Sequence, residues 1–272
     1  MDEQGLVEGL EAAQFGPHRW SAGWHDDGDN ERFRGASFVV RDLRGARFVD
    51  CDLSGVRIVD GCLVDVDVSG WVSNLVVNGV DVTEYVEAEL DRRHPERMQL
   101  RGIRNADDFR AMWGTVEGLW SELTARAERL PESVRYKRVH DEWSFVETLR
   151  HLVFITDSWV SRTILDEPSP FHPLALPQTA YAPADAAALG MDLDAQPTYD
   201  EVKAARVDRV EVVRRVLDGL TDADLGRPCL RSPAPGYPEE ERPVGECLGV
   251  LMEEECEHYR FASRDLTLLE AR

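Results

Sequence analysis

Lysine is almost absent from this chain: Lys137 and Lys203 are the only lysines, and arginine supplies the other basic residues. The 272 residues carry a formal net charge of −21 at pH 7. A protein that binds nucleic-acid phosphates, or the anionic surface of a membrane, needs a basic face to neutralise them. The composition therefore predicts an acidic, soluble protein with no nucleic-acid partner and no membrane partner.

Long apolar runs and regularly spaced cysteines are absent as well. No run approaches the roughly 20 apolar residues of a membrane-spanning helix, and the first residues lack the apolar core of a secretion signal. The five cysteines show no CxxC spacing, so we expect free, buried thiols instead of a disulfide framework. These absences predict a cytoplasmic protein.

What the sequence does contain is a five-residue repeat that begins at Phe33. A large apolar residue recurs at every fifth position, and a mostly small residue follows three positions later. A period of five fits neither a helix nor a simple strand, and repeats of fixed period are typical of solenoids. The large residues are Phe33, Phe38, Leu43, Phe48, Leu53, Ile58, Leu63 and Val68.

This pattern resembles the pentapeptide-repeat family, whose members wind four repeats into one square coil. The resemblance implies a short right-handed β-helix over residues 33–82, with the large and the small residues pointing inward. Because about two coils bury little surface, we expect this segment to pack against the rest of the chain in a structural or docking role.

From about residue 104 the apolar residues recur at spacings of three and four, which is typical of amphipathic helices. Ser144 with Glu147, and Thr198 with Glu201, predict capping boxes at two helix starts. Four long helices with one long connection, between the second and the third, predict a four-helix bundle. We expect the helices at about residues 109–130, 144–165, 199–220 and 244–269.

The fold class predicted for the whole chain is α+β and multidomain, with a short right-handed β-helix followed by a four-helix bundle. A turn at Asn78-Gly79 ends the repeats. The predicted divisions are an N-terminal extension (1–32), the repeats (33–82), a capping helix with a linker (83–103) and the bundle (104–272).

The fourth predicted helix carries four glutamates and a histidine in close succession. Helical spacing directs Glu254, Glu255 and His258 toward the bundle interior, and it directs Glu253 and Glu257 toward solvent. A buried glutamate is costly unless it is compensated, and a divalent cation compensates it efficiently. Since Glu254 and His258 lie one helical turn apart, they can share one ion. Glu255 remains an alternative to Glu254 at this stage.

A third ligand has to come from another helix. Among the seven histidines, His151 alone lies in the middle of an amphipathic stretch. A lone histidine there is more often a buried, hydrogen-bonded side chain, but Glu254 and His258 on a second helix favour a ligand. Three protein ligands leave a position open for water or substrate, as in catalytic sites. Nitrogen and oxygen ligands suit zinc, nickel, iron or manganese.

The stretches DEWSFVETLRHLVFITDSW and EEECEHYRFASRDL resemble the DinB/YfiT-like superfamily of metalloenzymes, over residues 104–270. The lysine-poor composition looks like that of a high-GC bacterium, and actinobacterial members also carry pentapeptide repeats before the bundle. The family holds a divalent metal with a histidine of the second helix and two residues one turn apart on the last. Many members have two histidines there, whereas mycothiol-dependent maleylpyruvate isomerase uses a His, Glu, His set on zinc. The resemblance implies His151, Glu254 and His258 as ligands, with zinc as the first expectation.

Several members of this superfamily are transferases or isomerases that use low-molecular-weight thiols such as mycothiol. The resemblance therefore implies a metal-dependent S-transferase or isomerase with a small-molecule substrate and a thiol co-substrate. Two alternatives remain open: a non-catalytic interaction protein that binds a partner through the repeats, and a hydrolase that uses metal-bound hydroxide. A homodimer is also expected from the helical bundles of this superfamily.

Side chains near the predicted ligands are candidates for supporting roles. Glu147 lies one turn before His151, so we expect it to accept a hydrogen bond from that imidazole. Trp143, Arg150 and Arg260 are candidates to line the mouth of the site or to bind a substrate, with ordinary packing or surface pairing as the alternative for each.

Overall fold

The computed structural model describes residues 33–49, 51–178, 181–235, 237 and 240–271. The extension predicted for residues 1–32 lies outside the described residues. The described part is mostly helical, and its strands form two antiparallel pairs of two residues each. The pairs are β1 (Val76–Val77) with β2 (Val80–Asp81), and β3 (Pro228–Cys229) with β4 (Arg242–Pro243).

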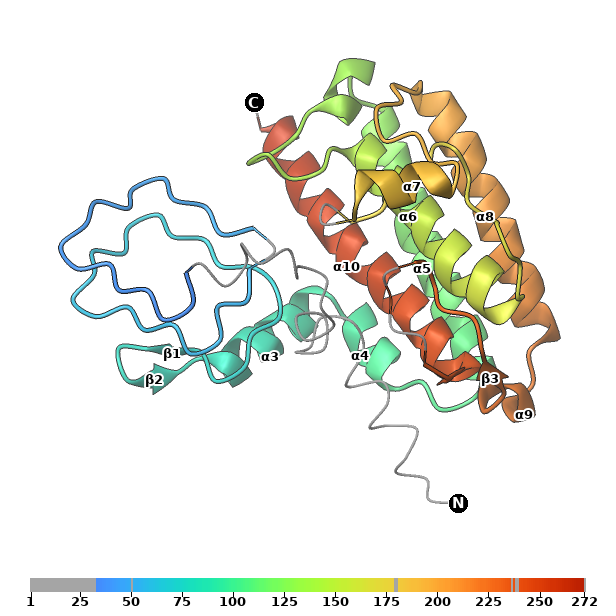
Figure 1. Ribbon diagram of the computed structural model, residues 1–272, viewed down its shortest axis with the longest axis horizontal. Coiled ribbons are helices and arrows are strands. Elements are labelled where there is room, and N and C mark those ends of the chain that lie inside the picture. Colours follow the sequence, from blue (N-terminus) through green and yellow to red (C-terminus); the bar gives the residue numbers. More distant parts are fainter. Residues whose placement is uncertain (1–32, 50, 179–180, 236, 238–239, 272) are drawn as a thin grey trace.

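Four long helices pack around one apolar core, as the 3-4 spacing predicts (Figure 1). The last helix packs against the first and the second, and the third packs against the second and the first, so the four close a ring. They are α5 (Ala106–Glu128), α6 (Phe145–Ile155) continued by η2 (Thr156–Ile164), α8 (Tyr199–Gly219) and α10 (Val244–Glu270).

Two of these helices begin where the capping boxes predict. At α6 the Ser144 hydroxyl accepts from the Glu147 amide at 3.3 Å, and the Glu147 carboxylate accepts from the Ser144 amide at 2.8 Å. Thr198 and Glu201 form the same reciprocal pair at the start of α8. Each box satisfies backbone donors that the first helical turn leaves without partners.

The second long helix changes its winding after Ile155. In η2 the backbone is π-helical, and beyond its end the Leu165 amide donates to the Val160 carbonyl, five residues back, at 3.0 Å. The Asp157 carboxylate in this stretch is fully buried, and it accepts from Arg209 of α8 at 2.6 Å. This pair ties η2 to the third helix.

Short elements fill the remaining connections. The Asn78-Gly79 turn joins β1 to β2, as predicted, with both residues at positive φ. The short helix α4 packs on α10. The short helices are α3 (Thr83–Arg93), α4 (Glu96–Arg101), η1 (Glu132–Tyr136), α7 (Pro183–Ala188) and α9 (Asp222–Leu225).

The predicted β-helix is wrong, and with it the α+β class. Residues 33–49 and 51–75 contain no strand, and Figure 1 shows them as open coils set apart from the long helices. All eight large residues of the repeat, which were expected to point inward, are exposed, from 46% at Leu53 to 67% at Ile58. A solenoid is stable when each coil buries its apolar side chains against the next. These coils do not bury them.

The sequence period produces a regular series of turns instead. The Ala36 amide donates to the Phe33 carbonyl at 2.9 Å, and equivalent bonds recur ten and twenty residues further on. Gly35, the third residue of the first turn, has a φ of 71°. A type II turn needs a positive φ at that position, which glycine adopts without strain. The repeat therefore sets a turn at every second pentapeptide.

The thiols divide between the two parts of the chain. Cys229, Cys247 and Cys256 are buried and free, as predicted, whereas Cys51 and Cys62 are free but exposed. The exposure of the last two follows from the missing interior of the coils.

The described helices include none with the long, uncharged apolar stretch that a bilayer crossing requires.

Candidate metal centre

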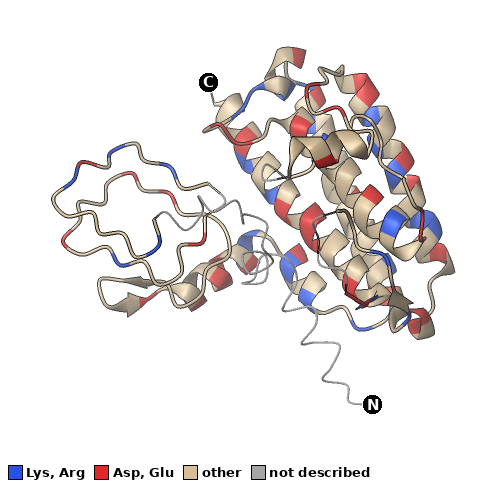
Figure 2. Cartoon of the chain, viewed as in Figure 1, with Lys and Arg blue, Asp and Glu red and all other residues tan. Residues whose placement is uncertain are grey.

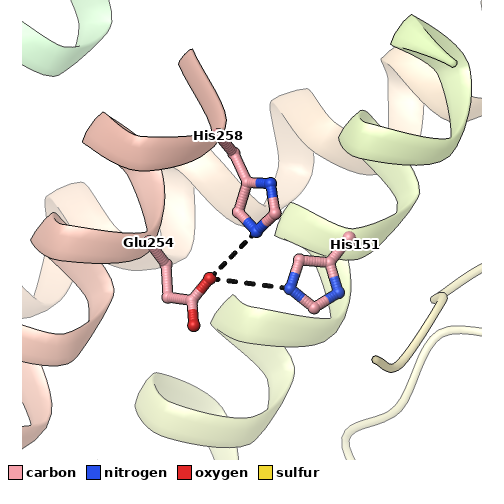
Figure 3. Close-up of side chains that lie close together, drawn as sticks. All are labelled: His151, Glu254 and His258. Atoms are coloured by element: carbon pink, nitrogen blue, oxygen red, sulfur yellow. Dashed lines mark ion pairs between the residues drawn. The ribbon is translucent and has the colours of Figure 1, made fainter. Parts of the chain in front are cut away.

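Helices α6 and α10 bring His151, Glu254 and His258 together (Figure 3). The His258 Nε2 atom lies 3.0 Å from Glu254 Oε2, and the His151 Nε2 atom lies 3.6 Å from the same oxygen. One potential ligand atom from each residue lies within 4.8 Å of the others. His151 and Glu254 are buried, and His258 is partly exposed. The two helices thus gather two imidazoles and one carboxylate at one point.

A hydrogen bond at Nδ1, the ring nitrogen that does not face Glu254, fixes the orientation of the His151 ring. Its Nδ1 atom lies 2.9 Å from the Leu176 carbonyl, which can only accept, so Nδ1 carries the hydrogen. Burial lowers the pKa of His151, against the opposing pull of the Glu254 carboxylate. In the neutral ring, Nε2 then presents a lone pair toward Glu254. Two electron-rich atoms that face each other in a buried site call for a cation between them.

The Glu254 carboxyl is held in its charged form. Burial by itself raises its pKa, but interaction with the imidazoles of His151 and His258 in their protonated forms outweighs burial and holds the pKa well below its usual range. A buried carboxylate beside two imidazoles is a ligand set that metal-binding proteins use for divalent transition metals. The three side chains therefore fit a divalent ion.

The neighbouring Glu255 is engaged elsewhere. Its side chain is fully buried, and both of its oxygens accept from Nη2 of Arg206 on α8, at 2.5 and 2.6 Å. It therefore crosses the bundle toward α8, whereas Glu254 lies beside the two histidines. Of the two glutamates left open by the sequence, the structure groups Glu254 with the histidines.

Glu253 and Glu257 are only partly exposed, whereas helical spacing predicts a solvated face for them. Glu257 accepts from Arg97 of α4 at 3.1 Å. Burial, reinforced by the charges of Glu254 and Glu257, raises the pKa of Glu253 to about 9. The surroundings of Glu253 therefore favour the neutral carboxyl more than water does.

Trp143 covers the candidate ligands, at the position where the sequence places a residue of the mouth. Its ring centroid lies 4.5 Å from that of His151 and 5.8 Å from that of His258. The Phe261 ring is a second aromatic neighbour of His258, at 6.3 Å between ring centroids. Aromatic rings thus flank the more exposed of the two histidines, so a substrate that reaches the site meets these rings first.

The two arginines proposed to bind substrate have protein partners. Arg150 is buried, and its three nitrogens donate to the carbonyls of Leu174, Asp192 and Ala195 at 2.8 to 3.2 Å. Arg260 donates to Glu257 and lies over the Phe261 ring. The structure thus gives Arg150 a role in holding the loop between η2 and α8. That Arg150 and Arg260 bind a substrate stays a prediction.

The group that orients His151 is the one that sequence reasoning missed. Glu147 was expected there, but it accepts from Ser144 and Arg138 instead. The actual partner is the main-chain carbonyl of Leu176, in the loop between the second and third long helices. Every residue has a main-chain carbonyl, so no residue pattern could have identified this one as the partner of His151.

The chain was compared with known families and proteins. The family model of the DinB superfamily matches residues 115–262, which include α6, α8 and all three candidate ligands. The match does not extend to residues 33–81. Neither the curated proteins nor the solved structures gave a match.

Proposed function

Because the chain belongs to the DinB superfamily, we propose that it is a metal-dependent enzyme in which His151, Glu254 and His258 hold one divalent ion. The observation that carries this proposal is the buried Glu254 carboxylate facing the Nε2 atoms of two histidines from two helices. Zinc is the first candidate, and nickel, iron or manganese suits the same nitrogen and oxygen atoms.

Each residue around the candidate ion would have a separate role. The Leu176 carbonyl fixes the tautomer of His151, and Glu254 supplies the negative charge that offsets a divalent cation. Trp143, whose ring lies next to both imidazoles, would limit the access of water to the ion. A divalent ion held by three protein ligands would supply Lewis acidity, which lowers the pKa of a water or a thiol bound at the remaining position.

We further propose that the substrate is a small molecule and that a low-molecular-weight thiol of the mycothiol type is the co-substrate. The activity would be that of an S-transferase or an isomerase. Support comes from the resemblance of the His, Glu, His set to that of the thiol-dependent isomerase of this superfamily. The partly exposed His258 marks the side from which a thiol reaches the site.

Metal content tests the first proposal. We expect one equivalent of metal per chain by mass spectrometry of the purified protein, and its loss in His151→Ala and in His258→Ala. The matched control is His94→Ala, which removes a histidine that pairs with Glu96 outside the site. A protein that carries no metal, and takes up none on incubation with zinc, nickel, iron(II) or manganese, contradicts the proposal.

Omission of the thiol tests the second proposal. The metal-loaded protein is assayed with an electrophile such as 1-chloro-2,4-dinitrobenzene, with and without mycothiol or glutathione. We expect a product only with the thiol, with one thiol consumed and one chloride and one proton released per product. Turnover of ester substrates without any thiol would instead identify a hydrolase and overturn the thiol proposal.

A further inference from the structure

The segment that joins η1 to α6 turns sharply just before the candidate metal centre, and we call its residues 139–143 the strap. The Glu142 amide donates to the Val139 carbonyl at 2.9 Å, and the two residues between them, His140 and Asp141, have φ values of 52° and 60°. Two successive positive φ values are typical of a type I′ turn, which glycine, asparagine and aspartate form most readily. Because His140 lacks the freedom of glycine at positive φ, contacts with its surroundings have to hold it there.

One arginine of the repeat segment makes such contacts. Nη2 of Arg47 donates to the His140 carbonyl at 2.6 Å, and Nη1 pairs with the Asp141 carboxylate. An exposed ion pair contributes little by itself, but this guanidinium binds two consecutive residues at once. Arg47 therefore restrains both central residues of the turn, and it does so from outside the bundle.

The other end of the strap lies on α10. Glu142 accepts from Nη2 of Arg264 at 2.6 Å. Trp143 follows, and its ring centroid lies 4.5 Å from that of His151 and 5.8 Å from that of His258. The strap thus extends from a contact with the coils to a ring beside both histidines of the candidate metal centre.

His258 is the candidate ligand that solvent reaches, since His151 and Glu254 are buried and His258 is partly exposed. The Trp143 ring is stacked on the His258 imidazole, with 25° between the ring planes. Trp143 comes immediately before Ser144, the N-cap of α6, so the strap and not the helix sets its position. Movement of the strap would therefore uncover His258.

We propose that Arg47 is a positioning residue, which holds the strap so that Trp143 limits the passage of ions and small molecules to the candidate metal centre. The inference rests on the proposed function, because it concerns access to an ion held by His151, Glu254 and His258. It assigns a role to the repeat segment, which contributes no candidate ligand: the segment controls how fast the site is filled and emptied.

Hydrogen exchange of the metal-free full chain, followed by nuclear magnetic resonance, tests whether Arg47 holds the strap. Arg47→Met keeps much of the side chain and removes its donors, so we expect the Glu142 amide to exchange about tenfold faster. Amides in the middle of α6 and α10 should keep their rates, since the core is unchanged. The matched control is Arg44→Met, because Arg44 lies in the same repeat segment and pairs with Asp42. It should leave every rate unchanged.

The kinetics of zinc binding test whether the strap controls access. Zinc uptake is followed by rapid mixing, and zinc release is followed by transfer to an excess of a chelating dye. In Arg47→Met we expect both rates to rise about tenfold and the dissociation constant to stay within about twofold, because a cover slows entry and exit alike. Arg47→Lys, which keeps the charge, should give intermediate rates, and Arg44→Met should give wild-type rates.

A variant on the bundle side of the contact keeps the test decisive if Arg47→Met folds poorly. Asp141→Asn removes the same ion pair and keeps a residue type that tolerates positive φ. The bond from Arg47 to the His140 carbonyl remains possible in this variant. We therefore expect the same changes in hydrogen exchange and zinc rates, but of about threefold.

Three results would overturn the role of Arg47 and leave the metal centre in place. The first is an unchanged exchange rate of the Glu142 amide in Arg47→Met and in Asp141→Asn, which would mean that other contacts hold the turn. The second is faster exchange with unchanged zinc rates, which would mean that the strap does not limit access. The third is faster release with a proportional rise in the dissociation constant, which would mean that Arg47 acts on the ligands. A chain that takes up no metal would instead contradict the proposed function, and with it the role of the strap in access.

Discussion

Three consecutive glutamates on α10 differ in pKa and in binding partners because their surroundings differ. Glu253 is partly buried, and burial with the charges of Glu254 and Glu257 raises its pKa to about 9 against the weaker effect of Arg97. Glu254 faces two histidines, and its pKa is held well below the usual range. Glu255 is paired with Arg206 across the bundle. Within one turn of helix, the same side chain thus has surroundings that favour its neutral form, surroundings that suit a metal ligand, and a buried ion pair.

Exchange of each acid for its amide separates the last two roles. Glu254→Gln should lower metal affinity by about 100-fold or more, since an amide is a far weaker ligand, with little loss of stability. Glu255→Gln should keep the metal, but leaves the Arg206 charge buried without a counter-charge. We expect it to lower the free energy of unfolding by about 3 kcal/mol. Metal titration and chemical denaturation of both variants measure these effects. Metal loss in Glu255→Gln with retention in Glu254→Gln would reverse the assignment.

The metal should dissociate at a lower pH than it does from an ordinary histidine site. The metal binds neutral His151 and ionised Glu254, and the pKa of each is shifted downward, so protons compete with the metal only at lower pH. We expect full occupancy at pH 6, and a decline of up to about tenfold in affinity per pH unit for each proton taken up below that. Equilibrium dialysis at a series of pH values checks this. Release that is already complete at pH 6.5 contradicts it.

At the scale of the element, the loop between η2 and α8 is part of the candidate site. Arg150 of α6 holds the carbonyls of Leu174, Asp192 and Ala195, and Leu176 in the same loop accepts from His151. The Leu176 amide in turn donates to the Arg150 carbonyl at 3.2 Å. The loop is therefore anchored to α6 at the candidate ligand His151 and at Arg150, the residue before it.

Arg150→Met should loosen this loop without unfolding the bundle. Methionine fills much of the same volume but cannot donate the three hydrogen bonds, so amide hydrogen exchange should become faster between residues 174 and 195. Metal affinity should fall by about 10-fold to 100-fold, because the Leu176 carbonyl loses its position. Arg138→Met, which removes an exposed partner of Glu147, is the control and should change neither quantity. Unchanged exchange in Arg150→Met would mean that the loop is held by other contacts.

The sequence predicts helices better than it predicts the rest of the chain, and particular residues show why. Ser144 and Thr198 mark helix starts because the capping box is a local interaction between residues three apart. The π-helical winding of η2 and the tertiary pairing of its Asp157 with Arg209 are contained in no local pattern. The candidate ligands were predictable since helical spacing puts Glu254 and His258 on one face, but the Leu176 carbonyl was not.

At the scale of the whole molecule, the repeats and the bundle are separate in their packing. Apart from Val72 and Leu75, the described residues from 33 to 75 are exposed, and Arg47 supplies a link to the bundle through the His140 carbonyl at 2.6 Å. The β-helix predicted from the five-residue period was wrong, because a period shows how apolar residues are spaced and does not show whether they are buried. Leu53 has the right spacing for a solenoid interior and is 46% exposed.

Removal of residues 33–75 should therefore leave the bundle intact. We expect one metal per chain, as in the full protein, and a melting temperature within a few degrees of it, because little of the bundle core would be uncovered. Calorimetry and metal analysis of the truncated chain measure both. A truncated chain that no longer melts cooperatively would show that the repeats stabilise the bundle.

Charge is mixed over the whole bundle. Figure 2 shows acidic and basic residues interspersed along the long helices, with no broad basic face in that view. This distribution agrees with the composition, and the absence of a nucleic-acid partner stays a prediction.

The Leu176 carbonyl has a consequence for how this protein can diverge. Every amino acid offers a main-chain carbonyl at position 176, so the residue there is free to change while its contact with His151 persists; proline alone would lose the amide that donates to the Arg150 carbonyl. Insertion or deletion of a single residue between the Asp157–His172 contact and Leu176 would shift the carbonyl away from the imidazole. In this loop, selection should therefore act on length and tolerate substitution.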